Sequence, residues 1–221
     1  MSDDPITDLA KKSIEESAKI AEKFLGKLIS PALEEGGGIL SDTMKFWRFK
    51  NQINLVLKAQ AFLTSRGIDP VRILPKTLIP ILEHGSLEED SEMQDRWAAL
   101  LAHAADPILG QQVRPSYPEI LKQLSPIEAR ILEAFYDSMK DVPIDDREKH
   151  GMIKARVLDV FSLSDEEYKV IVDSLVRLGI CQWPTSLGGV TIGDSPMILR
   201  SYDFISLSPL GSDFIKACKL A

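Results

Sequence analysis

Histidine and cysteine are scarce in this sequence, and that limits the chemistry the chain can perform. Its 221 residues include three histidines, at 84, 103 and 150, and two cysteines, at 181 and 218. None has the spacing of a zinc site or a redox pair, and no HExxH, phosphate-binding glycine loop or nucleophile elbow occurs. We therefore expect no metal and no cofactor. We also expect no enzymatic activity, although catalysis by groups without a motif stays open.

Long apolar runs are missing as well. No segment approaches the roughly 18 to 20 apolar residues that a membrane-spanning helix needs, and the first ten residues, MSDDPITDLA, are acidic where a secretory signal would be basic. Hydrophobic residues at 44% and charged residues at 27% are typical of a soluble globular protein. The formal charge of −7 argues against a protein devoted to coating nucleic acid. We expect a cytoplasmic protein without a transmembrane segment.

The first half of the chain has helical periodicity, interrupted by breaks. An amphipathic pattern over 5–30 predicts a first helix, and the glycines at 36–38 predict a break before a second helix over 40–66. Three prolines within 69–83 indicate a short, kinked, buried helix. Ser86 and Glu89 have the spacing of a capping box, which predicts a further helix over 86–106 with Trp97 in the core. The sequence thus predicts an irregular helical bundle as a first domain over 1–110.

The second half has a different pattern and is expected to form a separate domain over 116–221. Capping boxes are predicted at Ser116 with Glu119, Ser125 with Glu128, and Ser164 with Glu167. Helices over 125–139, 152–161 and 165–178 precede strands over 180–183 and 198–206, and a last helix begins at 208. This order is similar to that of a winged helix. The fold class that we expect is mainly α, with a helical bundle followed by a winged-helix-like α+β domain.

Two stretches around the predicted domain boundary carry a family resemblance. LEEDSEMQDRWAALLAHAA, at 87–105, and PSYPEILKQLSPIEARIL, at 115–132, resemble the abortive infection alpha family of bacterial proteins. The resemblance implies a role in defence against phage. It implies no reaction and no catalytic residues.

Opposite charges are concentrated in adjacent segments. Between 44 and 82 there are seven basic residues and one acidic residue, whereas between 83 and 106 there are seven acidic residues and one basic residue. Arg96 and His103 are seven positions apart and so share a helix face. The candidate binding residues are Lys45, Arg48, Phe49, Lys50, Lys58, Arg66, Arg72, Lys76, Arg96 and His103.

Two interpretations of this charge pattern stay open. The basic and acidic segments can face each other and pair at the rims of their helices. Alternatively, the basic segment is exposed and binds RNA or an anionic membrane surface.

The predicted winged helix is poorly suited to reading DNA. Its third helix, at 165–178, has more acidic than basic residues, and the loop over 184–199 has no basic residue. A duplex would repel such a surface, because DNA readers contact phosphates through Lys and Arg. We therefore expect a protein partner, not yet identified, rather than sequence-specific DNA. A transcription regulator is a further alternative.

Overall fold

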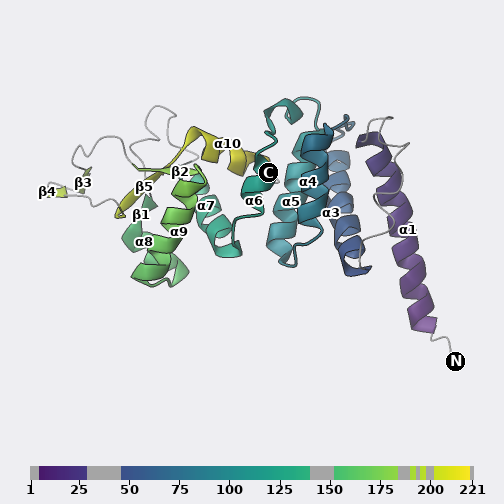
Figure 1. Cartoon of the computed structure of the whole chain (residues 1–221), viewed down its shortest axis with the longest axis horizontal. Helices are drawn as coiled ribbons and strands as arrows, with labels where there is room; N and C mark the ends of the chain where they lie inside the picture. The colour runs from purple at the N-terminus through teal and green to yellow at the C-terminus, as the bar shows by residue number, and fades with distance from the viewer. Residues whose placement is uncertain are drawn as a thin grey trace. The chain divides into compact units, whose positions relative to one another are not determined.

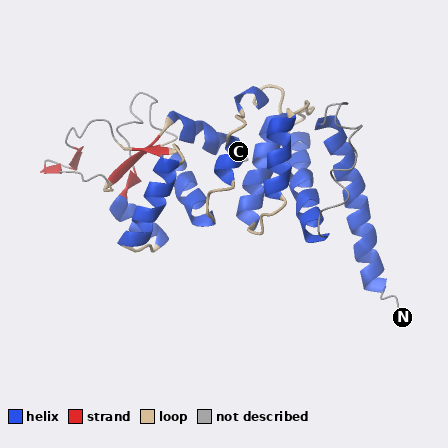
Figure 2. Ribbon diagram, viewed as in Figure 1, coloured by secondary structure: helices blue, strands red, loops and turns tan. Residues whose placement is uncertain are grey.

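A computed structural model gives the structure of the protein and describes residues 5–28, 46–139, 152–183, 190–192, 195–197 and 202–219. Side chains are described for all of these except 5–14, 46–49, 152, 190–192 and 195–197. Packing divides the chain into two units, Met1–Gln123 with Ala217–Ala221 and Leu124–Lys216, which we call the helical unit and the mixed unit. Figure 2 shows that helix predominates, which confirms the expected mainly helical fold.

The helical unit consists of packed helices joined by connecting segments (Figure 1). α3 packs against α1, α4 and α5, and α5 also packs against α4 and the short 3-10 helix η1. α6 contacts α4. The elements are α1 (Pro5–Leu28), α3 (Phe46–Ser65), α4 (Pro75–Gly85), α5 (Ser91–Ala105), η1 (Gly110–Gln112) and α6 (Tyr117–Leu121).

α5 is the most deeply buried helix of this unit. Every side chain from Arg96 to Ala105 is buried, and five alanines in this stretch let neighbouring backbones approach closely. Trp97, predicted to lie in the core, has 1% of its surface exposed. A Cβ added to Gly85 would lie 3.2 Å from Trp97 Cβ and 2.4 Å from Leu55 Cδ1, so only glycine fits there without rearrangement.

The capping box predicted at Ser86 is wrong. α5 begins at Ser91, and its cap is Asp90, whose carboxylate accepts a hydrogen bond from Met93 N at 2.9 Å. Ser86 instead follows the end of α4, where its hydroxyl donates to the carbonyl oxygen of Glu83 at 2.8 Å. Ser86 is buried, so its hydroxyl needs an acceptor, and the preceding helical turn supplies one.

The other predicted capping boxes have different outcomes. Ser125 with Glu128, and Ser164 with Glu167, both form the full reciprocal pair, as predicted. Ser116 makes no side-chain capping bond, so that prediction is wrong. The backbone of Ser116 is helical, with φ −78° and ψ −16°, whereas a capping residue is typically extended, as Ser125 and Ser164 are. The Glu119 carboxylate lies 2.5 Å from Lys122 Nζ and 3.6 Å from His84 Nε2 instead.

The mixed unit combines helices with a small antiparallel sheet. β5 is the central strand of a three-stranded sheet in the order β1-β5-β2, and β3 pairs with β4 as a separate hairpin. Met152 lies opposite Ile205, and Cys181 lies opposite Leu207. The elements are α7 (Pro126–Ser138), β1 (Met152–Ile153), α8 (Lys154–Phe161), α9 (Asp165–Arg177), β2 (Cys181–Gln182), β3 (Val190–Ile192), β4 (Ser195–Met197), β5 (Phe204–Leu207) and α10 (Pro209–Ala217).

The start of α10 lies close to the turn between α9 and β2. Ser208 N donates to the carbonyl oxygen of Ile180 at 2.9 Å, and the Ser208 hydroxyl donates to that of Gly179 at 2.5 Å. Gly179 has a φ of +71°, a left-handed conformation that favours glycine. A Cβ on Gly211 would lie 2.1 Å from the carbonyl oxygen of Ile180, so the close approach requires glycine there too.

Candidate functional site

One residue of the predicted basic segment pairs with the acidic segment where two helices pack. α3 and α5 pack against each other, and Lys58 Nζ on α3 lies 2.5 Å from Asp95 Oδ1 on α5. Both side chains are partly exposed, so this pair lies at the rim of the helix contact. The pairing of opposite charges is therefore observed at Lys58, in the middle of the basic segment.

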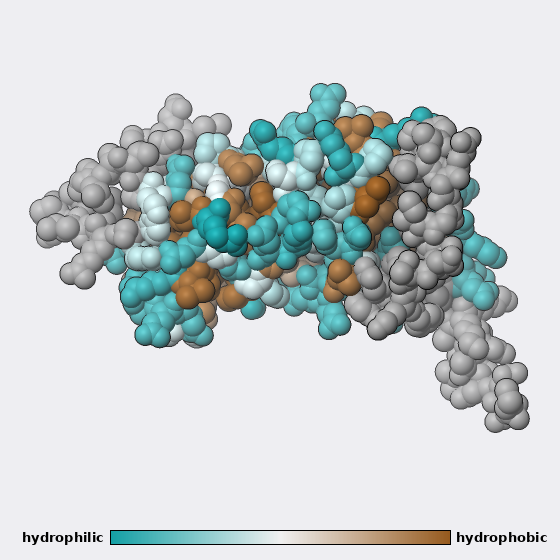
Figure 3. Space-filling model, in the orientation of Figure 1, coloured by the Kyte–Doolittle hydropathy of each residue, from teal (hydrophilic) through white to brown (hydrophobic). Residues whose placement is uncertain are grey.

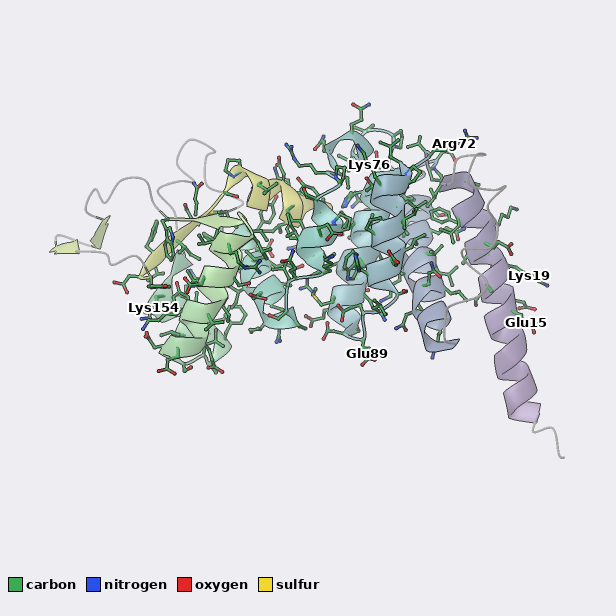
Figure 4. The ribbon with its side chains drawn as sticks, viewed as in Figure 1. Glu15, Lys19, Arg72, Lys76, Glu89 and Lys154 are labelled. Carbon is green, nitrogen blue, oxygen red and sulfur yellow. The ribbon has the colours of Figure 1, made fainter. Side chains whose placement is uncertain are left out.

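The two ends of the basic segment lie far apart. α3 has 20 residues, which corresponds to about 30 Å along the helix axis. Lys50 lies in its first turns, near the acidic start of α5, because Asn51 Nδ2 donates to the carbonyl oxygen of Glu88 at 3.0 Å. Figure 4 shows Arg72 and Lys76 at one end of the helical unit and Glu89 at the other. The candidate residues thus do not form one continuous patch.

Three of the candidates have undescribed side chains. Lys45 lies outside the described residues. Arg48 and Phe49 belong to α3, but the positions of their side chains are not described.

Four basic residues gather where α1 and α3 end and α4 begins. We call this group, Lys27, Arg66, Arg72 and Lys76, the basic end. Ile73 N donates to the carbonyl oxygen of Leu28 at 3.0 Å, which fixes the 71–74 segment beside the last turn of α1. All four side chains are exposed, and in the described part of the chain no carboxylate lies within ion-pair distance of them.

One cation of the basic end has a contact with an aromatic ring, and two acids lie nearby, exposed Asp69 and buried Asp106, whose carboxylate accepts a hydrogen bond from Ile108 N. The guanidinium carbon of Arg66 lies 4.5 Å from the centre of the Phe62 ring, a cation–π contact. Asp69, which is exposed, lines a small cavity together with Lys27. The cavity has a volume of about 200 Å³, below the roughly 300 Å³ at which small-molecule pockets usually begin.

Exposed aliphatic side chains lie on the connecting segments at the basic end. Val71 is 40% exposed, Leu74 63% and Ile108 78%. The backbone holds two of these segments together, since Val71 N donates to the carbonyl oxygen of Ala105 at 2.8 Å. Figure 3 shows hydrophobic residues at the surface of the helical unit, next to hydrophilic ones. Charge and apolar surface therefore occur together at this end.

Sequence reasoning missed these aliphatic residues. The segment 69–83 was expected to be one buried helix, but α4 begins only at Pro75, and Leu74 precedes it in an extended conformation. Proline disfavours helix at the residue before it, so Pro75 is the signal that could have placed Leu74 outside the helix. Pro107 could likewise have indicated that Ile108 lies in a turn.

Arg96 and His103 do not join the basic end. Arg96 is 6% exposed, with Nη1 3.9 Å from Glu92 Oε2. His103 is 8% exposed, its Nδ1 lies 2.8 Å from the carbonyl oxygen of Ala217, and its ring meets Phe62 edge-on at 5.8 Å. Both side chains are part of the packing of the helical unit.

In the mixed unit, acidic residues are concentrated at the start of α9. Asp165, Glu166 and Glu167 fill the first turn, and Lys169 Nζ lies 2.6 Å from Asp165 Oδ2. Lys154 forms a second ion pair with Asp165. Hydrogen bonds from Lys154 and then Lys169 hold the pKa of Asp165 below its ordinary value. These pairs engage two lysines near α9 and leave Glu166 and Glu167 exposed.

A second small cavity lies between α7 and α8. It has a volume of about 150 Å³, and its lining is largely apolar, with Arg156 at its side. Among the described residues no three metal-ligating side chains come together. No helix in the described part of the chain is long and apolar enough to cross a bilayer.

Comparison with known proteins gives one match. The model of a family described as abortive infection alpha matches residues 50–218. No curated protein and no solved structure matches the chain. The match extends over α3 to α10 and so includes most of the helical unit as well as the mixed unit.

Proposed function

Because the chain belongs to the abortive infection alpha family, we propose that it is a phage-defence protein that acts by binding another macromolecule. The observation that carries the proposal is the family match over residues 50–218. The match includes residues of both units, so we assign the proposed function to the two units together and not to one of them.

Two features of the surface support binding rather than catalysis. The basic end combines exposed aliphatic side chains with cations that have no carboxylate partner among the described residues, an arrangement suited to a macromolecular surface. The cavities described above, of about 150 and 200 Å³, are smaller than the pockets that usually hold substrates. We further propose a cytoplasmic location, which is consistent with the free, buried thiols of Cys181 and Cys218.

We propose that the mixed unit is a winged helix, within the domain expected over 116–221. Supporting this are the element order α7, β1, α8, α9, β2, hairpin, β5 and the sheet order β1-β5-β2. In this arrangement α9 takes the place of the recognition helix and the β3–β4 hairpin that of the wing.

The charge of α9 favours a protein partner over DNA for this unit. Its first turn is acidic, and Asp165 already engages both Lys154 and Lys169. Binding measured by fluorescence anisotropy with labelled duplex DNA at low salt tests this. We expect no binding, and sequence-specific retention of a duplex would instead support the transcription-regulator alternative.

The defence proposal is tested by plaque assays on bacteria that express the full chain. We expect fewer plaques than in cells with an empty vector for at least one phage of a diverse panel. A Trp97→Ala variant is the matched control, because it should unfold the helical unit and abolish protection. No protection against any phage by a chain that accumulates in folded form would overturn the proposal.

A further inference from the structure

We propose that the basic end docks onto an anionic membrane surface, with Leu74 and Ile108 entering the lipid headgroup region. The four cations of the basic end would lie at the level of the lipid phosphates. For its connection with phage defence, this inference rests on the binding function proposed above. The lipid contact itself is tested separately from protection against phage.

The exposed aliphatic residues are presented on segments whose backbone is already hydrogen-bonded. Ile108 N and Leu109 N donate to the Asp106 carboxylate at 2.7 and 2.9 Å, and the carbonyl oxygen of Leu74 accepts bonds from Thr77 N and Leu78 N. These groups need no water as a partner. The apolar tips can therefore leave water without leaving those backbone groups unsatisfied.

The charge distribution of the helical unit would orient it on such a surface. Lys27, Arg66, Arg72 and Lys76 lie at one end, and these four cations outnumber the two acids there, Asp69 in the cavity beside them and the buried Asp106. The opposite end holds Glu89 and the acidic residues next to it (Figure 4). An anionic surface attracts the first end and repels the second, although the chain as a whole has a formal charge of −7.

The side chains at the basic end favour lipid over RNA. Proteins that bind single-stranded RNA stack bases on aromatic rings, but here Phe62 is covered by the guanidinium of Arg66 at 4.5 Å. The two most exposed large hydrophobic residues of the end, Leu74 and Ile108, are aliphatic. Basic residues that flank aliphatic tips are the combination that a lipid interface accommodates.

The test is co-sedimentation of the purified full chain with vesicles. One set contains phosphatidylcholine alone, and the other contains equal parts of phosphatidylcholine and phosphatidylglycerol. We expect binding to the second set only, weakening as salt is added. Because each cation near an anionic surface contributes about fivefold to partitioning, R72Q/K76Q should reduce binding about 25-fold. L74S/I108S should reduce it at least about tenfold through lost apolar contact.

Matched variants elsewhere control for general effects. K19Q/K50Q removes the same charge from exposed positions away from the basic end, and I20S/L87S removes aliphatic side chains of the same unit that are 50% and 46% exposed. Both controls should bind vesicles within about twofold of the parent, because none of these side chains would meet the lipid. All variants alter exposed residues, so their thermal unfolding should match that of the parent.

Several outcomes would overturn the proposal. These are failure to bind anionic vesicles, equal losses in the control variants, or binding unaffected by L74S/I108S. A labelled single-stranded RNA that binds the parent but not R72Q/K76Q, with no binding to vesicles, would assign the basic end to RNA instead. Loss of vesicle binding with phage protection intact would leave the defence proposal standing.

Discussion

The Nδ1 atom of His103, near the end of α5, lies 2.8 Å from the backbone carbonyl oxygen of Ala217. The two residues are 114 positions apart, and both belong to the helical unit. His103 is 8% exposed, so the contact is buried. His103, one of the binding candidates named from the sequence, thus has a structural role, because its side chain joins the end of α10 to the most deeply buried helix.

Replacing His103 should therefore destabilise the protein. His103→Leu leaves the buried carbonyl oxygen of Ala217 without its donor, which should lower the free energy of unfolding by about 1–3 kcal/mol. His103→Gln keeps an N–H donor and should lose less. Urea unfolding followed by circular dichroism measures the free energy of unfolding of both variants. Equal stability of the leucine variant and the parent would contradict a stabilising hydrogen bond from His103 to Ala217.

The capping residues give a prediction with a built-in comparison. Ser125→Ala removes a hydroxyl that bonds Glu128 in a full capping box, and should cost about 1 kcal/mol. Ser116→Ala makes the same chemical change at the start of a helix that has no side-chain cap, and it should leave the free energy of unfolding almost unchanged. The difference between the two free energies of unfolding checks the assignment, and equal losses would show that Ser125 is not an effective cap.

Two glycines should respond to alanine in opposite ways. At Gly211 the new Cβ would lie 2.1 Å from the carbonyl oxygen of Ile180, so Gly211→Ala must shift α10 and should cost at least about 2 kcal/mol. At Gly26, inside α1, a Cβ meets no atom within 4 Å, and Gly26→Ala should stabilise by roughly 0.5–1 kcal/mol. Thermal unfolding of both variants tests whether α10 approaches the carbonyl oxygen of Ile180 closely, and an unchanged melting temperature for Gly211→Ala would contradict it.

The thiol groups should be unreactive in the folded protein. Burial raises the pKa of Cys181 to about 12, and Cys218 is also buried. At about pH 8, near the ordinary pKa of a thiol, little thiolate is available at Cys181, so Ellman's reagent should modify it only after unfolding. Because the unfolded chain ionises first, a pH above the ordinary value favours unfolding. Rapid modification of both native thiols would contradict this.

Local sequence rules predicted which segments form helices better than they predicted the residue at which each helix begins. Gly67 and Gly179 directly follow the helices predicted over 40–66 and 165–178, and both have the positive φ typical of a helix end, at 65° and 71°. The same rules predicted a cap at Ser86, whereas the cap is Asp90, because the spacing of a hydroxyl and an acid does not reveal whether the hydroxyl is exposed or buried. Burial, a tertiary property, decided between them.

Long-range pairing explains what else was missed. Met152 and Ile153 were expected to start a helix, but they pair with Ile205 and Phe204 instead. A strand of two residues has no periodicity of its own, and its partner lies some fifty positions away. The candidate site has the same limitation. The count of charges over 44–82 found Arg66, Arg72 and Lys76 but not Lys27, which comes from α1. Only the packing of the helices shows that the basic residues lie at two separate ends of α3.

The enclosure of α5 also has a kinetic consequence. The stretch from Arg96 to Ala105 is buried on all sides, so it cannot open alone while the neighbouring helices stay in place. Its amide hydrogens should exchange with heavy water only when the helical unit unfolds as a whole. The slowest amides of α5 therefore measure the global free energy of that unit under native conditions, with neither denaturant nor mutation.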